Sequence, residues 1–199
     1  MTAAATPTID EANFALALIT SRQSILPKRL VAPGPSVEQV KLMFSAAAAA
    51  PDHGEIRPWR FVVVPVDKRD LLAEAFGQAL RERDTEATAE HVEQAREKAY
   101  RAPFVALTIA MLGPTVPDID PLERMISVGA AIQNFLLMAH SLGFGAGLTS
   151  GQAMRSAVLA QCFGLKEGER AVCCINVGTA TRRKAGRLRP DMDAFVSSL

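Results

Sequence analysis

The spacing of hydrophobic and polar residues predicts a chain in which helices and buried strands alternate. Apolar residues recur at helical intervals, so we expect helices over residues 10–21, 36–50, 122–142 and 152–163. β-branched and aromatic residues gather in short apolar runs, so we expect strands over residues 59–66, 104–112 and 171–177. Alternation of this kind is typical of α/β and α+β proteins.

The segments between these elements are more polar. Residues 67–101 alternate Ala, Glu, Arg and Leu, which predicts one or two exposed helices that Gly77 or Thr85 divides. The charge run at residues 81–86 is typical of a solvated helix face. Residues 27–35 are rich in Pro and Gly and predict a break in regular structure.

The predicted helix over residues 122–142 is the most apolar stretch of the chain. Gln133, Asn134 and His140 interrupt it, whereas a membrane span needs about 20 nearly uninterrupted apolar residues. Apolar residues lie all round this helix, so it needs burial on more than one side. A subunit interface supplies such burial most easily in a chain of this size.

The glycines at residues 143–147 predict a turn. They follow a helix, whereas a dinucleotide-binding loop follows a strand and opens a helix, so a Rossmann site is not expected. The serine in residues 147–151 stands one position too late for the Gly-x-Ser-x-Gly motif of hydrolases.

Composition places the chain among ordinary globular proteins. Its 199 residues are 49% hydrophobic and 22% charged, which suits a single domain over residues 1–199. The net charge of +1 is small for a protein that binds nucleic acid or an anionic membrane. Residues 1–10 lack the basic start and apolar run of an export signal. Cys162, Cys173 and Cys174 form no disulfide framework, so we expect a cytoplasmic protein.

Candidate chemistry is sparse when it is taken from the residues alone. No histidine has a metal-ligand partner at a suitable spacing, and His53 stands apart because it lies in a polar loop. Arg22 and Ser24 together suit a phosphate group, and the basic tail after Thr179 adds positive charge. A helix C-terminus and a solvated tail explain the same residues, and composition alone slightly favours that explanation. The residues alone therefore indicate a candidate anion site and no reaction.

Four segments carry a family resemblance. They are Ser21-Arg22-Gln23-Ser24, Ala50-Pro51-Asp52-His53-Gly54 with Arg57-Pro58-Trp59-Arg60-Phe61, the stretch from Gly129 to Gly147, and Val177-Gly178-Thr179. In this order they resemble the nitroreductase family of flavin-dependent homodimers, and most of all its minimal bacterial branch. The second segment, which resembles the Ala-Pro-Asp-His and Pro-Trp-x-Phe pair of that branch, is the most specific.

The resemblance implies a fold and an assembly. The fold would be α+β in three layers, with a central mixed, mainly antiparallel sheet flanked by helices. The homodimer would form on the long central helix, and residues 1–9 and 180–199 would be extended or wrap the interface. Two FMN sites would lie at that interface, each lined by both subunits.

The resemblance also implies which residues bind FMN. They are Arg22, Gln23 and Ser24 at the ribityl-phosphate end, His53 from the other subunit, Leu148, Thr149 and Ser150 beside the ring and ribityl chain, and Arg187 and Arg189 at the phosphate. No side chain is expected to be an essential acid or base, because the flavin carries the chemistry.

The function implied is that of an FMN-dependent NAD(P)H oxidoreductase. NADH or NADPH would deliver hydride to flavin N5, and an oxidised small molecule, such as a nitroaromatic or a quinone, would then take its place in a ping-pong scheme. Residues 138–143 resemble the stretch that the family uses for the nicotinamide nucleotide. The alternatives are a flavin-binding protein with little turnover, another flavin reaction such as dehalogenation or flavin breakdown, and a nucleic-acid-associated protein that uses the basic tail.

Three positions depart from the family pattern. Gln23 replaces an arginine, Ala49 stands where the minimal branch has an arginine, and Leu148 replaces a bulky tryptophan. The first change removes a positive charge from the phosphate end. The last should open the edge of the site.

Overall fold

The computed structural model describes residues 9–113, 117–183, 185–186 and 188–199. Its centre is a five-stranded sheet in the order β1-β5-β3-β2, with β4 also paired to β5. The strands are β1 (Leu30–Val31), β2 (Trp59–Val63), β3 (Phe104–Met111), β4 (Gly145–Thr149) and β5 (Glu169–Ala180). All pairs between these strands are antiparallel, and an isolated bridge between Ser24 and Ala146 is parallel. The mainly antiparallel sheet predicted above is confirmed.

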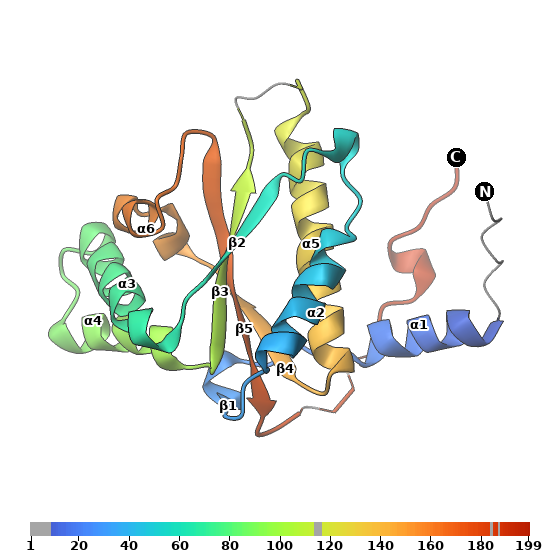
Figure 1. Ribbon diagram of the computed structural model, residues 1–199, viewed down its shortest axis with the longest axis horizontal. Coiled ribbons are helices and arrows are strands. Elements are labelled where there is room, and N and C mark those ends of the chain that lie inside the picture. Colours follow the sequence, from blue (N-terminus) through green and yellow to red (C-terminus); the bar gives the residue numbers. More distant parts are fainter. Residues whose placement is uncertain (1–8, 114–116, 184, 187) are drawn as a thin grey trace.

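Helices cover both faces of this sheet. They are α1 (Ile9–Ser21), α2 (Val37–Ala48), α3 (Arg69–Arg83), α4 (Ala89–Arg96), α5 (Pro121–Ser141) and α6 (Ala157–Cys162). Figure 1 shows α2 and α5 on one side of the sheet and α3, α4 and α6 on the other. The predicted three-layer α+β architecture is therefore confirmed. Helix α1 extends away from these layers, beside the C-terminal segment (Figure 1).

Strand β3 shows why the sheet lies between two cores. Phe104 and Ala106 pack into the core under α2 and α5, whereas Val105 and Leu107 pack into the core under α3 and α6. Successive side chains of a strand point to opposite faces, so a strand buried on both faces is apolar throughout. That is why this strand was predictable from a continuous apolar run.

Helix α5 is buried on one face only. The Asp120 side chain caps it by accepting a hydrogen bond from the Leu122 amide at 2.7 Å. Its inner face includes Phe135, which is fully buried, while Leu122 and Ile126 on the outside are 69% and 66% exposed. The partner subunit that we expect on this outer face stays a prediction. No helix in the described ranges is long and apolar enough to cross a membrane.

The predicted pair of helices is confirmed, but some other predicted boundaries were wrong. Of the two candidate dividing residues, Thr85 lies at the break between α3 and α4. Gly77 is inside α3, where an added Cβ would lie 3.0 Å from Cγ of Arg96, so this glycine lets the two helices pack closely. Strand β2 ends at Val63 instead of residue 66, and β5 extends beyond residues 171–177 at both ends.

The glycine-rich turn at residues 143–147 was also predicted wrongly. Only Gly143, with a φ of +88°, turns the chain after α5, and β4 already begins at Gly145. Strand β1 likewise lies inside the stretch of residues 27–35, where no regular structure was expected. Both short strands pair with β5, a contact distant in sequence that local composition does not encode.

The adjacent cysteines of β5 lie on opposite faces of the sheet. Cys173 packs into the core under α5, and Cys174 into the core under α3. Burial raises the pKa of Cys173 to about 11 and that of Cys174 to about 12. Cys162 at the end of α6 is exposed. The thiolate is the reactive form of cysteine, and Cys173 and Cys174 are both buried and held as thiols. Of the three cysteines, we therefore expect only Cys162 to react in the folded protein.

Thiol labelling tests this arrangement. With a maleimide at pH 8, the native protein should react at Cys162 alone, and all three cysteines should react after unfolding in guanidinium. Mass spectrometry counts the adducts. A Cys162→Ser variant that still reacts quickly in the native state would contradict the two-sided burial of Cys173 and Cys174.

Candidate functional site

Two segments far apart in sequence meet beside β4. The amide of Ile25 donates a hydrogen bond to the carbonyl of Ala146 at 2.8 Å, next to the parallel bridge between Ser24 and Ala146. Gly147 makes this approach possible, because a Cβ at that position would overlap the carbonyl oxygen of Ile25. The glycine is therefore required by a backbone contact and not by a turn.

A cavity of about 400 Å³ opens beside this contact. Arg22 and Ser24 line it from the segment after α1, and Leu148 and Thr149 line it from the end of β4. The wall formed by α5 consists of Gly129, Ile132, Gln133 and Leu136. The structure thus brings together four residues that the sequence analysis assigned to one site.

Positive charge gathers at the Arg22 end of the cavity. The Nε atom of Arg22 is buried and has no hydrogen-bond partner in the described part of the chain. Burial, and then the charge of Arg189, lower the pKa of Arg22. The Arg189 guanidinium donates to the carbonyl of Thr20 at 3.0 Å. Two like charges beside an unsatisfied buried donor are costly unless an anion joins them.

Further groups surround this pair. Nε2 of His140 lies 2.9 Å from the Ser21 hydroxyl, and the Arg183 guanidinium donates to the carbonyl of Gly143 at 3.1 Å. Burial and the charges of Arg183 and Arg22 lower the pKa of His140. The imidazole is therefore neutral near pH 7, and the arginines supply the positive charge.

Asn176 on β5 supports the other end of the cavity. Its side chain is buried, and its amide donates to the carbonyl of Gly147 at 3.3 Å and to the hydroxyl of Thr149 at 3.0 Å. The same amide approaches the carbonyl of Cys174 at 3.1 Å. Asn176 thus fixes the end of β4. Sequence reasoning missed this residue, because within a buried strand it resembles any other polar interruption.

The other predicted site residues lie elsewhere. Gln23 is partly buried and does not line this cavity, and Ser150 faces a second pocket described below. Arg187 lies outside the described residues. The described ranges contain no group of three His, Cys, Asp or Glu residues that could hold a metal ion.

His53 does not reach the cavity of its own chain. It lies in a short turn before β2, and its Nδ1 is 2.7 Å from Oε2 of Glu123 on α5. Both side chains are more than half exposed. Gly54 adopts a φ of +69° in this turn, a conformation that glycine tolerates. The role of His53 in a partner's site stays a prediction.

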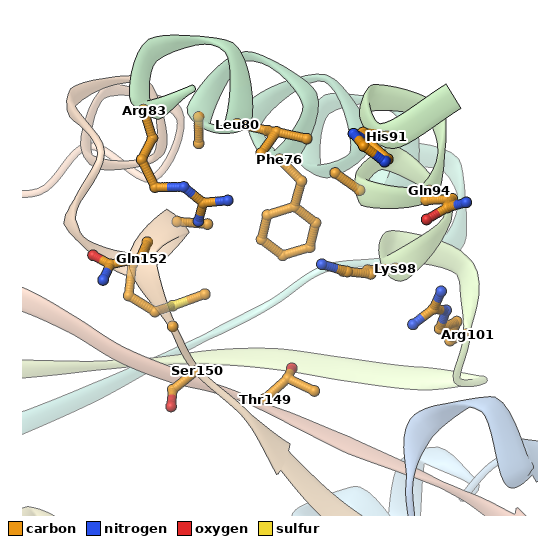
Figure 2. Close-up of a pocket in the computed structure, with 15 residues that line it drawn as sticks. Phe76, Leu80, Arg83, His91, Gln94, Lys98, Arg101, Thr149, Ser150 and Gln152 are labelled. Atoms are coloured by element: carbon orange, nitrogen blue, oxygen red, sulfur yellow. The ribbon is translucent and has the colours of Figure 1, made fainter. Parts of the chain in front are cut away.

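A second pocket, of about 410 Å³, adjoins the first at Thr149 (Figure 2). It lies between the α3–α4 hairpin and the segment that follows β4. Its polar lining includes Arg83, His91, Gln94, Lys98, Arg101 and Ser150. Residues 81–86 are all exposed, as expected of a solvated helix face, and Arg83 among them also lines this pocket. The fold of the hairpin, and no local sequence signal, brings these groups together.

The structure thus combines a mainly antiparallel sheet between helices with a cavity beside β4 that Arg22 lines. A family model described as the Nitroreductase family matches residues 19–179. The chain belongs to the nitroreductase family, which confirms the resemblance seen in the sequence.

Individual relatives agree with this assignment. The chain is 33% identical over 186 residues to a Haemophilus influenzae protein provisionally named an NAD(P)H nitroreductase, covering 93% of this chain and 99% of that one. It is 28% identical to Escherichia coli YdjA, with the same provisional name, covering 92% and 98%.

Solved structures share the fold. A nitroreductase-like family protein from Bacillus cereus matches with a TM-score of 0.81 and 19% identity, covering 100% of this chain and 98% of that one. A Desulfovibrio desulfuricans protein solved in complex with FMN matches with a TM-score of 0.70 and 23% identity, covering 92% and 96%.

The contact at Gly147 gives a testable prediction. Gly147→Ala should lower the free energy of unfolding by about 1–3 kcal/mol, because the new methyl group must push Ile25 away from β4. The control Gly186→Ala, where an added Cβ meets nothing within 4 Å, should change it by less than about 0.5 kcal/mol. Urea denaturation measures both. Equal stability of the two variants would show that the segment at Ile25 is not held against β4.

Proposed function

We propose that the protein is an FMN-dependent oxidoreductase that uses NADH or NADPH to reduce an oxidised small molecule, such as a quinone or a nitroaromatic. The observation that carries this proposal is that Arg22 lines one end of the cavity and that a second arginine, Arg189, lies close enough for its charge to lower the pKa of Arg22. The names of the Haemophilus and Escherichia relatives and the FMN in the Desulfovibrio structure support it.

The residues at the Arg22 end fit the phosphate of FMN. A phosphate carries close to two negative charges at neutral pH and offers three acceptor oxygens. It would satisfy the orphaned Nε of Arg22 and relieve the repulsion between Arg22 and Arg189. Gln23 contributes no charge here, and Arg183 nearby supplies positive charge that the family takes from an arginine at position 23.

The rest of the cavity fits the flat part of the cofactor. Ile132 and Leu136 of α5 offer an apolar wall, and the hydroxyls of Ser24 and Thr149 offer polar contacts to the ribityl chain. Bound FMN would supply the chemistry, accepting hydride at N5 and passing two electrons to the acceptor. Leu148, 44% exposed, leaves the edge of the site more open than a tryptophan would.

The protein's own residues would position the cofactor and the substrates and would take no chemical part in the reaction. Asn176 holds Thr149 and the end of β4 in place, and neutral His140 lies at the phosphate end without adding charge. No described side chain is assigned as an essential acid or base. The scheme therefore depends on placement of the cofactor and of the two substrates that follow each other beside it.

We place this activity in a homodimer in the cytoplasm. Helix α1 has no buried residue, and its Phe14 and Leu16 are 68% and 60% exposed. The outer face of α5 adds Leu122 and Ile126, and apolar surface of this extent usually marks an interface. His53, which lies on the same side of α5 through Glu123, would then approach the partner's cofactor. The free cysteines fit a reducing compartment.

Flavin retention and reduction test the proposed function. The purified protein is mixed with FMN, desalted, and then titrated anaerobically with NADH and, separately, NADPH. We expect retained flavin absorbance that bleaches with at least one nucleotide. Retained absorbance that neither nucleotide bleaches would indicate a flavin store in place of a reductase. Loss of flavin on desalting would contradict the proposal.

A further inference from the structure

The second pocket, between the α3–α4 hairpin and the end of β4, has a one-sided charge. Arg83, Lys98 and Arg101 line it, together with His91, and no Asp or Glu does. In the described part of the chain, Arg83 and Lys98 make no ion pair or hydrogen bond, and the nearest carboxylate to Arg101, that of Glu97, is 3.9 Å away. The whole chain is nearly balanced, with 22 basic and 21 acidic residues, so this bias belongs to the pocket.

The pocket also offers an aromatic surface between its charges. Figure 2 shows the ends of Arg83 and Lys98 directed from opposite sides toward the ring of Phe76. Phe76 is 9% exposed, so its ring is held in the wall. The small exposed part of this ring gives the pocket an apolar floor that a flat ligand can contact, while a negatively charged substituent lies between the guanidinium and the ammonium groups.

The second pocket shares one lining residue with the candidate flavin cavity. Thr149 lines both, and Ser150 and Gly151 continue the wall of the second pocket from the end of β4. A ligand in the second pocket would therefore lie next to the β4 end of the candidate flavin cavity.

We propose that this pocket binds the anionic group of the electron acceptor, so that the enzyme prefers flat acceptors that carry a carboxylate, with Arg83 as the specificity-determining residue. The proposal rests on the proposed function. For a nitroaromatic acid, one NAD(P)H and one proton reduce the nitro group to a nitroso group and water. The carboxylate takes no part in that step and serves only in binding.

Matched acceptors test the proposal. The FMN-loaded protein is assayed with 4-nitrobenzoate and with 4-nitrobenzamide, which has nearly the same shape but no charge. We expect kcat/KM to be about tenfold higher for the carboxylate, because a charge-assisted contact is lost with the amide. Arg83→Gln should remove this preference, mainly through a higher KM for 4-nitrobenzoate, and leave the amide unchanged.

Arg81→Gln is the matched control. Arg81 lies on the same helix, carries the same charge and does not line the pocket, so this variant should keep the full preference for the carboxylate. Equal kcat/KM for the two acceptors in the wild type would overturn the proposal. Another result would also overturn the proposal. If Arg83→Gln lost a preference for NADPH over NADH but kept the preference for the carboxylate acceptor, the pocket would bind the 2′-phosphate of NADPH and not the acceptor.

Calorimetric titration separates this proposal from the proposed function. Benzoate, which is not reduced, should bind the wild type more tightly than benzamide, and Arg83→Gln should remove the difference. If neither nitro compound is reduced but benzoate binds in this way, the reductase assignment fails and the anionic pocket stands. If acceptors are reduced but benzoate and benzamide bind alike, the pocket assignment fails alone.

Discussion

The backbone contact between Ile25 and Ala146 is the constraint on which the site depends. It holds the segment after α1 against the end of β4, and Gly147 permits it because any side chain there would strike the Ile25 carbonyl. Without this contact Arg22 would not share a cavity with Thr149. The Arg22 end of the site and the end of β4 are thus joined by one backbone hydrogen bond between residues more than 100 positions apart.

The parts of the fold that depend on local pattern were predictable from the sequence. Strand β3 is buried on both faces and is therefore apolar except at Thr108, and α2 is capped by Ser36 in a capping box shared with Gln39. Strand β4 was not predictable, because it opens on glycines that carry no strand preference. A side chain at Gly145 would meet Ala180 and Leu30, and one at Gly147 would meet the Ile25 carbonyl, contacts that only the tertiary fold shows.

Some residues of the candidate site were likewise predictable from the sequence, and others were not. Arg22 and Ser24 suggested an anion site from their chemistry, but their connection to Leu148 and Thr149 came from the family resemblance. Arg83 and Lys98 could not have been chosen, since a charge on a polar helix usually faces water, and both are exposed; only the fold of the α3–α4 hairpin brings them to one pocket. Asn176 was missed because its role depends on the end of a strand that was itself unpredicted.

If Arg22 and Arg189 hold the phosphate of FMN, a flavin without that phosphate must bind more weakly. Affinities for FMN and for riboflavin, which lacks the phosphate, can be measured by quenching of flavin fluorescence. We predict that FMN binds about 100-fold more tightly than riboflavin, as expected for two charge-assisted contacts. Equal affinities for the two flavins would contradict it, because Arg22 and Arg189 would then contribute nothing to binding.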